Sequence, residues 1–137
     1  NLGTILRAGE GAGITGVIMS RDTVDIYNPK VVRSTMGSAF RVPFLYTDDL
    51  PGTVRELKAG GIRLFAAHLE GRNNYEEEDY TGNTGFLIGN EGNGLTEELS
   101  AAADAWVKIP MAGKVESLNA AIAASILMFE TARQRRA

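Results

Sequence analysis

A glycine-rich segment at residues 89–95 (GNEGNGL) carries residue types that could hold a ligand. It directly follows the apolar run 85–89, and its glycines would let the backbone approach a bound molecule closely. The carboxyl edge of an α/β sheet is where small molecules bind, and Glu91 would project a carboxylate from that edge. A plain turn that leads into a capped helix explains the same residues, so the sequence leaves both interpretations open.

A second segment, residues 109–119 (IPMAGKVESLN), also follows an apolar run, 105–109. It brings Ser117 and Asn119 to the expected start of the last helix. The simpler interpretation makes Ser117 the N-cap of that helix and Asn119 incidental. If both apolar runs are parallel strands of one sheet, the two segments lie at the same edge and could frame one pocket.

The first residues of the chain combine an amide, a glycine and a guanidinium as Asn1-x-Gly3-x-x-x-Arg7. Asn1 and Arg7 differ by six positions, which is not quite one face of a helix, so we expect Asn1 to act from the preceding turn. Gly3 is costly inside a helix, which indicates close packing or the close approach of a ligand.

Glycines 11, 13 and 16 match the GxGxxG string of dinucleotide-binding proteins. In those proteins the glycines follow a strand and open a helix, so that the pyrophosphate meets the helix N-terminus. Here they follow a helix and lead into a strand. The reversed order argues against a nucleotide-using enzyme of the doubly wound type.

The composition excludes several kinds of site. The chain has no cysteine and one histidine, His68, which removes disulfides, thiolate metal sites, a cysteine nucleophile and a catalytic histidine pair. We therefore expect no metal, and by itself His68 reads as an ordinary core residue. No apolar run could span a bilayer and no signal peptide is seen, so we predict a cytoplasmic protein without a membrane partner.

The charges are unevenly distributed, although the net charge is only −3. An acidic run fills 76–79, whereas the stretch 26–47 has no acidic residue and contains Lys30, Arg33 and Arg41. Arginine is well suited to phosphate because its planar guanidinium binds in a fork. The stretch is compatible with a surface that faces RNA, and ordinary solvated arginines explain it equally well.

The pattern of apolar runs predicts strands at 14–19, 42–46, 62–69, 85–89 and 105–109, alternating with helices. The helices are expected at 2–12, from Asn28-Pro29 to about 37, from Asp48-Asp49 to Gly60-Gly61, at 97–103, and from Ser117 onward with Leu118, Ile122, Ile126 and Phe129 on one stripe. Residues 71–83 are polar and predict a loop. Such alternation predicts one α/β domain, 1–137, with a mostly parallel sheet covered by helices on both faces.

Three segments in combination resemble the SpoU (TrmH) family of RNA 2'-O-ribose methyltransferases, within the SPOUT superfamily. The segment NLGTILR looks like the first motif of the family, FLIGNEGNGL like the second and IPMAGKVESLNAAIAAS like the third, while VVRSTMGSAFRVP looks like the stretch after the second strand. The resemblance covers nearly the whole chain. It implies a C-terminal trefoil knot, a feature that periodicity cannot predict.

The resemblance also implies a cofactor, S-adenosylmethionine, bound in the loops of the knot. By matched position, the cofactor-binding residues would be Ala66, Ala67, His68, Gly89, Glu91, Gly94, Ile109, Met111, Ser117 and Leu118. The catalytic set would be Asn1, Arg7, Glu91, Ser117 and Asn119, and RNA would be bound by Arg7, Arg33 and Arg41. Members act as homodimers, in which the first-motif arginine completes the site of the other subunit.

The implied reaction is S-adenosylmethionine-dependent transfer of a methyl group to a ribose 2'-oxygen of ribosomal or transfer RNA. The family's first-motif arginine has been proposed as the base, but a guanidinium keeps its proton at neutral pH. We therefore expect Arg7 to bind phosphate and to stabilise developing negative charge. The alternative function is a non-catalytic cofactor- or RNA-binding module, or a ribosome-assembly module, of the same fold. A role in antibiotic resistance also stays open.

The chain departs from the family pattern in two places. Ala120 and Ala121 stand where the family commonly has a Val-Ser pair, which removes one hydroxyl near the third motif. The chain also begins at Asn1 with a helix and no strand before it. We therefore expect that the first strand, and any N-terminal RNA-binding domain, lies upstream of this sequence.

Overall fold

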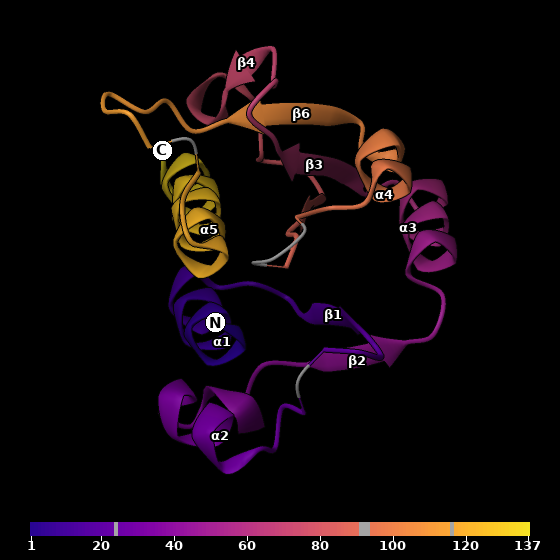
Figure 1. Ribbon diagram of the computed structural model, residues 1–137, viewed down its shortest axis with the longest axis vertical. Helices are drawn as coiled ribbons and strands as arrows, with labels where there is room; N and C mark the ends of the chain where they lie inside the picture. The colour runs from indigo at the N-terminus through magenta and orange to yellow at the C-terminus, as the bar shows by residue number, and fades with distance from the viewer. Residues whose placement is uncertain (24, 91–93, 116) are drawn as a thin grey trace.

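The computed structural model describes residues 1–23, 25–90, 94–115 and 117–137 (Figure 1). Its helices are α1 (Leu2–Ala12), α2 (Pro29–Thr35), α3 (Leu50–Ala59), α4 (Glu97–Ala102) and α5 (Ala120–Arg136), with short 3-10 turns η1 (Ser38–Phe40) and η2 (Tyr75–Glu77). Its strands are β1 (Val17–Ser20), β2 (Phe44–Thr47), β3 (Arg63–Ala67), β4 (Asn73–Asn74), β5 (Thr84–Leu87) and β6 (Ala105–Lys108).

All strand pairs in the described part of the chain are parallel, as predicted, but they form two sheets. β1 pairs with β2, and a separate sheet has the order β4-β6-β3-β5. Phe65 of β3 lies opposite Phe86 of β5 and Ala105 of β6, so the carboxyl ends of these three strands reach the same edge. The α/β class with parallel strands is confirmed. The trefoil knot stays a prediction, because strand order alone does not determine whether a chain passes through a loop.

Helices cover both faces of the four-stranded sheet, as predicted. Leu64 and Phe65 are neighbours on β3, and their side chains point to opposite faces, as the strand pleat requires. Phe65 packs with Leu127 of α5, whereas Leu64 packs with Val54 of α3 and Leu99 of α4. The helices α3 and α4 accordingly lie together, away from α5 (Figure 1).

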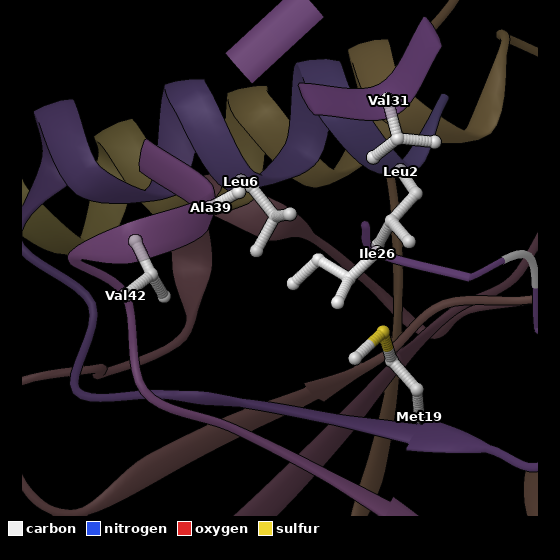
Figure 2. Close-up of a cluster of buried hydrophobic side chains, with 7 residues drawn as sticks. All are labelled: Leu2, Leu6, Met19, Ile26, Val31, Ala39 and Val42. Carbon is white, nitrogen blue, oxygen red and sulfur yellow. The ribbon is translucent and has the colours of Figure 1, made fainter. Parts of the chain in front are cut away.

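A separate hydrophobic core joins α1 and α2 to the β1–β2 pair. Figure 2 shows its buried side chains, which come from α1, β1, α2, η1 and the segments before α2 and after η1: Leu2, Leu6, Met19, Ile26, Val31, Ala39 and Val42. Gly3 lies where α1 approaches α2, and a Cβ there would fall 3.2 Å from the carbonyl oxygen of Val31. Close packing therefore explains this helical glycine. On its other side α1 packs against α5 (Figure 1).

The expected helix boundaries are confirmed at several ends. The side chains of Asn28, Asp49 and Thr96 accept hydrogen bonds from backbone N–H groups in the first turns of α2, α3 and α4. Gly13 ends α1 with φ +83°, and β1 follows, so this glycine-rich stretch has the helix-to-strand order that argues against a dinucleotide site.

The prediction that α5 begins at Ser117 is wrong. The helix begins at Ala120, and the side chain of Asn119 accepts hydrogen bonds from the N–H groups of Ala121 and Ile122. Asn119 is therefore the N-cap. The predicted apolar stripe is also wrong at Ile122 and Phe129, which are exposed, because the helix buries Ala121, Ala124, Leu127, Met128 and Glu130 instead.

The predicted loop 71–83 contains structure. Asn73 and Asn74 form β4, which pairs with β6, and Tyr75–Glu77 form η2. Tyr80 is completely buried, its ring meets Phe65 edge-on at a centroid distance of 4.9 Å, and its hydroxyl donates to the carbonyl oxygen of Tyr75. The segment thus completes the core beneath α5. Among the described residues, no helix combines the length and apolar character needed to cross a membrane.

Candidate functional site

A cavity of about 480 Å³ opens at the carboxyl edge of the four-stranded sheet. This volume falls within the range of small-molecule sites. Residues that follow β3, β5 and β6, together with the start of α5, line it: Ala67, His68, Leu69, Leu87, Ile88, Gly89, Asn90, Gly94, Leu95, Val107, Lys108, Ile109, Met111, Ser117, Leu118, Asn119, Ala120 and Ala123. The expectation that the glycine-rich segment and the segment 109–119 frame one pocket is confirmed.

The described ends of the glycine-rich segment, Gly89–Asn90 and Gly94, lie together at the cavity. The N–H of Gly94 donates to the carbonyl oxygen of Asn90 at 3.0 Å, and Gly94 has φ +66°, a conformation that favours glycine. A Cβ on Gly89 would lie 2.3 Å from the carbonyl carbon of Gly94, so only glycine allows this approach. Glu91, predicted as both a catalytic and a cofactor-binding residue, lies outside the described residues.

Asn119 lies at the junction of two predicted segments. Its side-chain oxygen caps α5, and its side-chain nitrogen donates to Oδ1 of Asn1 at 3.1 Å. Asn119 and Ser117 both line the pocket, and Asn1, which does not line it, is tied to the pocket through Asn119. The start of α1 and the start of α5 therefore meet beside the cavity.

His68 lines the pocket rather than filling the core. Its ring stacks on Trp106 of β6, with centroids 4.0 Å apart and planes 15° from parallel. Its Nδ1 accepts a hydrogen bond from the N–H of Glu70 at 3.1 Å, and the indole N–H of Trp106 donates to the carbonyl oxygen of Ser100 at 2.7 Å. These contacts hold the imidazole flat against a fixed indole at the cavity wall.

Ala66 is the one predicted cofactor-binding residue in the described ranges that does not line the pocket. It is completely buried, lying opposite Leu87 on one neighbouring strand and Trp106 on the other. The structure therefore places Ala66 inside the sheet, one residue before the chain reaches the cavity at Ala67.

The three arginines predicted to bind RNA lie in different settings. Arg7 is exposed on α1 and does not line the pocket. Arg33 is exposed on α2. Arg41 forms an ion pair with Glu10, which also accepts a hydrogen bond from Ser38 Oγ at 2.5 Å. The hydrogen bond from Arg41, with that from Ser38, lowers the pKa of Glu10 from 4.5 to about 2.

Sequence reasoning missed several residues of the lining. Most of them are apolar side chains at or just after strand ends, just before α4, or on the first turn of α5: Leu69, Leu87, Ile88, Leu95, Val107, Ala120 and Ala123. The predicted strand ends were the signal that could have found them, because parallel strands bring their carboxyl ends to one edge. Asn90 and Lys108 add polar groups. Among the described residues, no group of His, Asp and Glu side chains could hold a metal ion.

Comparison with known proteins finds close similarity in sequence. A protein of Bacillus subtilis (strain 168) named 23S rRNA (guanosine(2553)-2'-O)-methyltransferase RlmP is 36% identical over 94% of this chain and 52% of its own length. A protein of Xanthomonas campestris pv. campestris named 23S rRNA (guanosine-2'-O-)-methyltransferase RlmB is 36% identical over 98% of this chain and 54% of its own length. The chain thus spans about half the length of the curated relatives it matches.

Solved structures agree with these relatives. The SpoU methyltransferase AviRb from Streptomyces viridochromogenes, crystallised in complex with the cofactor AdoMet, superposes with a TM-score of 0.90 at 36% identity, covering 98% of this chain and 55% of that one. A TrmH/SpoU tRNA modifying enzyme of A. aeolicus superposes with a TM-score of 0.88 at 29% identity, covering 98% and 68%. Residues 1–129 match the SpoU rRNA Methylase family, and the chain belongs to that family.

Proposed function

We propose that this chain is the catalytic domain of an S-adenosylmethionine-dependent RNA 2'-O-ribose methyltransferase. The observation that carries the proposal is the cavity at the sheet edge, because it is lined by the second and third motif segments and tied by a hydrogen bond to the first. Membership of the SpoU family, and the relatives named as 23S rRNA 2'-O-methyltransferases, support the same reaction.

The residues of the cavity fit S-adenosylmethionine. Apolar side chains such as Leu87, Ile109 and Leu118 suit the faces of an adenine ring, while Ser117 and Asn119 offer hydrogen-bonding groups. Gly89 and Gly94 approach each other too closely for a Cβ on Gly89, so at these two positions the pocket is lined by backbone. When bound, the cofactor supplies a methyl group on a positively charged sulfonium, which needs no activation by the protein.

The protein's own part is to position a ribose and to stabilise negative charge on its 2'-oxygen. We assign the stabilisation of this negative charge to the guanidinium of Arg7, which makes no ion pair within the described part of the chain. Asn1 and Asn119 would fix the start of α1, and so the place of Arg7, one and a half turns along the helix. Glu91, Ser117 and Asn119 complete the proposed catalytic set.

Arg7 does not reach the pocket of its own chain, which supports a homodimer in which it completes the site of a second copy. The exposed apolar side chains of α5 offer a contact for that copy, since Ile122 is 51% and Phe129 is 47% exposed. Phe129 lies next to α1, because a Cβ on Gly11 would fall 3.5 Å from its ring. Both helices could therefore contribute to the dimer contact.

The proposed substrate is ribosomal or transfer RNA in the cytoplasm, bound with the help of Arg7, Arg33 and Arg41. The relatives named for 23S rRNA and the neighbour named for tRNA modification support both classes. Arg41 would have to bind phosphate while it is paired with Glu10. Its side chain is 57% exposed, which leaves it accessible to a phosphate.

Two measurements test the proposal. Calorimetric titration with S-adenosylmethionine and S-adenosylhomocysteine should give saturable binding at one site per chain. Incubation of the purified chain with the labelled cofactor and total RNA, followed by alkaline hydrolysis, should leave labelled dinucleotides, because a 2'-O-methyl group blocks cleavage at that position. Cofactor binding without any methyl transfer would favour the non-catalytic module instead.

A further inference from the structure

Two aromatic rings lie exposed side by side at the N-terminal half of the molecule. Tyr27 is 53% exposed and Phe40 is 70% exposed. Their ring centroids are 6.2 Å apart and their planes differ by 28°, so the two rings present roughly parallel faces. Large exposed rings that lie together mark interaction sites more often than isolated exposed side chains do. We call Tyr27 and Phe40 the aromatic pair.

The aromatic pair is held in place from behind. The ring of Tyr27 meets Phe44 of β2 edge-on at 5.8 Å, and Phe44 meets Tyr46 edge-on at 6.0 Å. The hydroxyl of Tyr46 accepts a hydrogen bond from the N–H of Ile26 at 3.0 Å, next to Tyr27 in the chain. The inner rings of Phe44 and Tyr46 pack against the core of Figure 2. The ring of Tyr27 is therefore supported by Phe44 before any partner arrives, which lowers the entropy cost of binding.

A strained turn brings the two rings together. Tyr27 precedes α2 and Phe40 follows it, and the chain returns between them through Met36 at φ +53° and Gly37 at φ +94°. This left-handed region is unfavourable for a methionine, and backbone strain of this kind concentrates at functional sites. The turn at Met36 and Gly37 reverses the chain, so that Phe40 lies beside Tyr27.

Charges of both signs lie beside the aromatic pair: the carboxylate of Asp25 accepts a hydrogen bond from the N–H of Tyr27 at 2.9 Å, whereas the stretch that follows is basic. The stretch 26–47 has no acidic residue, and α2, between the two rings in sequence, carries Lys30 and Arg33, both exposed. Neither forms an ion pair with another described residue. Arg41 is paired with Glu10, so Lys30 and Arg33 are the two basic residues of this stretch that form no ion pair with another described residue.

We propose that the aromatic pair stacks an unpaired base of the RNA substrate, while Lys30 and Arg33 bind the neighbouring phosphates. Exposed rings combined with nearby cations are the features by which proteins hold single-stranded nucleic acid. A base within a duplex is covered on both faces by its neighbours, so this surface selects an unpaired nucleotide. The inference rests on the proposed function, since it names how the RNA of that reaction is recognised at a distance from the cofactor pocket.

The test measures binding of a fluorescent single-stranded RNA oligonucleotide to the full chain, without cofactor, so that it does not depend on methyl transfer. The Tyr27→Leu/Phe40→Leu variant keeps apolar volume and removes both aromatic faces. It should weaken binding about fivefold or more, which corresponds to the loss of one stacked base. Tyr27→Phe keeps the ring and should bind like the wild type. Leu45→Ala is the matched control, because Leu45 is exposed on β2 and points away from Phe44's side of the strand.

Further measurements test the roles of Lys30 and Arg33 and the preference for single-stranded RNA. Lys30→Gln and Arg33→Gln should each lower the slope of log affinity against log salt by about 0.7, as expected for one phosphate contact on a single strand. A duplex of the same sequence should gain nothing from the aromatic pair. Three results would each overturn the proposal. The double leucine variant could bind single-stranded RNA as tightly as the wild type, or it could lose as much affinity for the duplex as for the single strand. The wild type could also fail to bind RNA.

Sedimentation of the double leucine variant tests the other occupant, a second copy of the chain. A loss of the dimer in that variant would overturn RNA stacking in favour of a subunit contact. Calorimetry with S-adenosylmethionine on the same variants keeps the two proposals apart. If the wild type does not bind cofactor, the proposed methyl transfer is wrong. The RNA-binding measurements then still test whether the aromatic pair stacks a base.

Discussion

The side-chain amide of Asn119 donates a hydrogen bond of 3.1 Å to Oδ1 of Asn1, across 118 positions of the chain. The same Asn119 caps α5 and lines the cavity at the sheet edge. One residue therefore links the pocket, the last helix and the first helix. This link gives Asn1 a way to influence the site although Asn1 does not contact the cavity.

Substitutions at Asn119 and Asn1 should separate capping from positioning. Asn119→Ala should lower the free energy of unfolding by about 1 kcal/mol, because two N–H groups of α5 lose their acceptor, whereas Asn119→Ser retains a capping oxygen and should be close to the wild type. Asn1→Ala keeps the cap and the pocket wall intact, so it should reduce turnover with little effect on cofactor affinity. Urea denaturation, calorimetry and methylation rates report the three quantities. Full turnover by Asn1→Ala would show that the bond has no part in the reaction.

Replacement of Arg7 tests its assignment as the cation of the reaction. Arg7→Ala should bind S-adenosylmethionine like the wild type and lose turnover by about a hundredfold or more, the usual effect of removing a group that stabilises transition-state charge. Arg7→Lys restores the positive charge without the planar fork, so its activity distinguishes charge from geometry. Turnover near the wild-type rate in Arg7→Ala would exclude this role.

A methyl group at Gly89 should disturb the wall of the cavity. In Gly89→Ala the new Cβ would lie 2.3 Å from the carbonyl carbon of Gly94, so the glycine-rich segment has to shift. We expect cofactor affinity to fall about tenfold or more, equivalent to ~1.4 kcal/mol. Trp106, the single tryptophan, stacks on the pocket residue His68, so its fluorescence can follow the titration. Gly113→Ala is the matched control, because nothing lies within 4 Å of a Cβ at Gly113 and its affinity should not change.

The ion pair between Glu10 and Arg41 predicts a specific response to acid. The pKa of Glu10 is lowered from 4.5 to about 2 by its hydrogen bonds from Arg41 and Ser38. A lowered folded-state pKa gives stability that is complete above pH 4.5 and is lost as the pH falls toward 2. The wild type should therefore be more stable than Glu10→Gln at neutral pH, and the difference should shrink across that window. Parallel curves for the two proteins from pH 7 to 2 would contradict the assignment.

A charge on the exposed face of α5 should disrupt the proposed homodimer. Phe129→Glu places a carboxylate where an apolar ring is 47% exposed, and burial of that charge in a contact would be costly. We expect sedimentation of the wild type at twice the chain mass of 14.7 kDa and of the variant at the single mass. Ala59→Glu, at an exposed position on α3, is a control that should leave the dimer intact. A wild type that sediments at the single mass would remove the dimer from the proposed function.

Five strands, β1, β2, β3, β5 and β6, could be predicted from the sequence because their runs are short, mostly apolar and bounded by glycine or polar residues. Their carboxyl ends then located the cavity, since parallel strands share one edge. The terminal helix was harder, because Ser117 and Asn119 both suit an N-cap and only tertiary structure selects between them. Ile122 and Phe129 likewise match a helical stripe. Packing against the sheet and α1 instead buries the face of α5 that carries Ala124, Leu127 and Met128.

Other features leave little trace in local sequence. β4 has two asparagines and no apolar alternation, so its pairing with β6 depends on the sheet rather than on its own residues. Tyr80 stands in an acidic, polar segment, yet it is buried because Gln134 and Arg135 of α5 hold the backbone around it. The aromatic pair also could not be predicted from local sequence, because Tyr27 and Phe40 are separated in sequence by all of α2.

The place of β6 in the sheet has a consequence for how the protein is made. β6 lies between β3 and β4, which both precede it in the chain. During synthesis on the ribosome β3 and β4 emerge before β6, and in the finished sheet they lie about 10 Å apart, two strand spacings, with β6 between them. Until residue 105 has left the exit tunnel, both strands present unpaired edges toward each other. The nascent chain is therefore exposed to mispairing of β3 and β4 until β6 emerges, and the cavity is completed later, when the residues up to Ala123 that line it have followed.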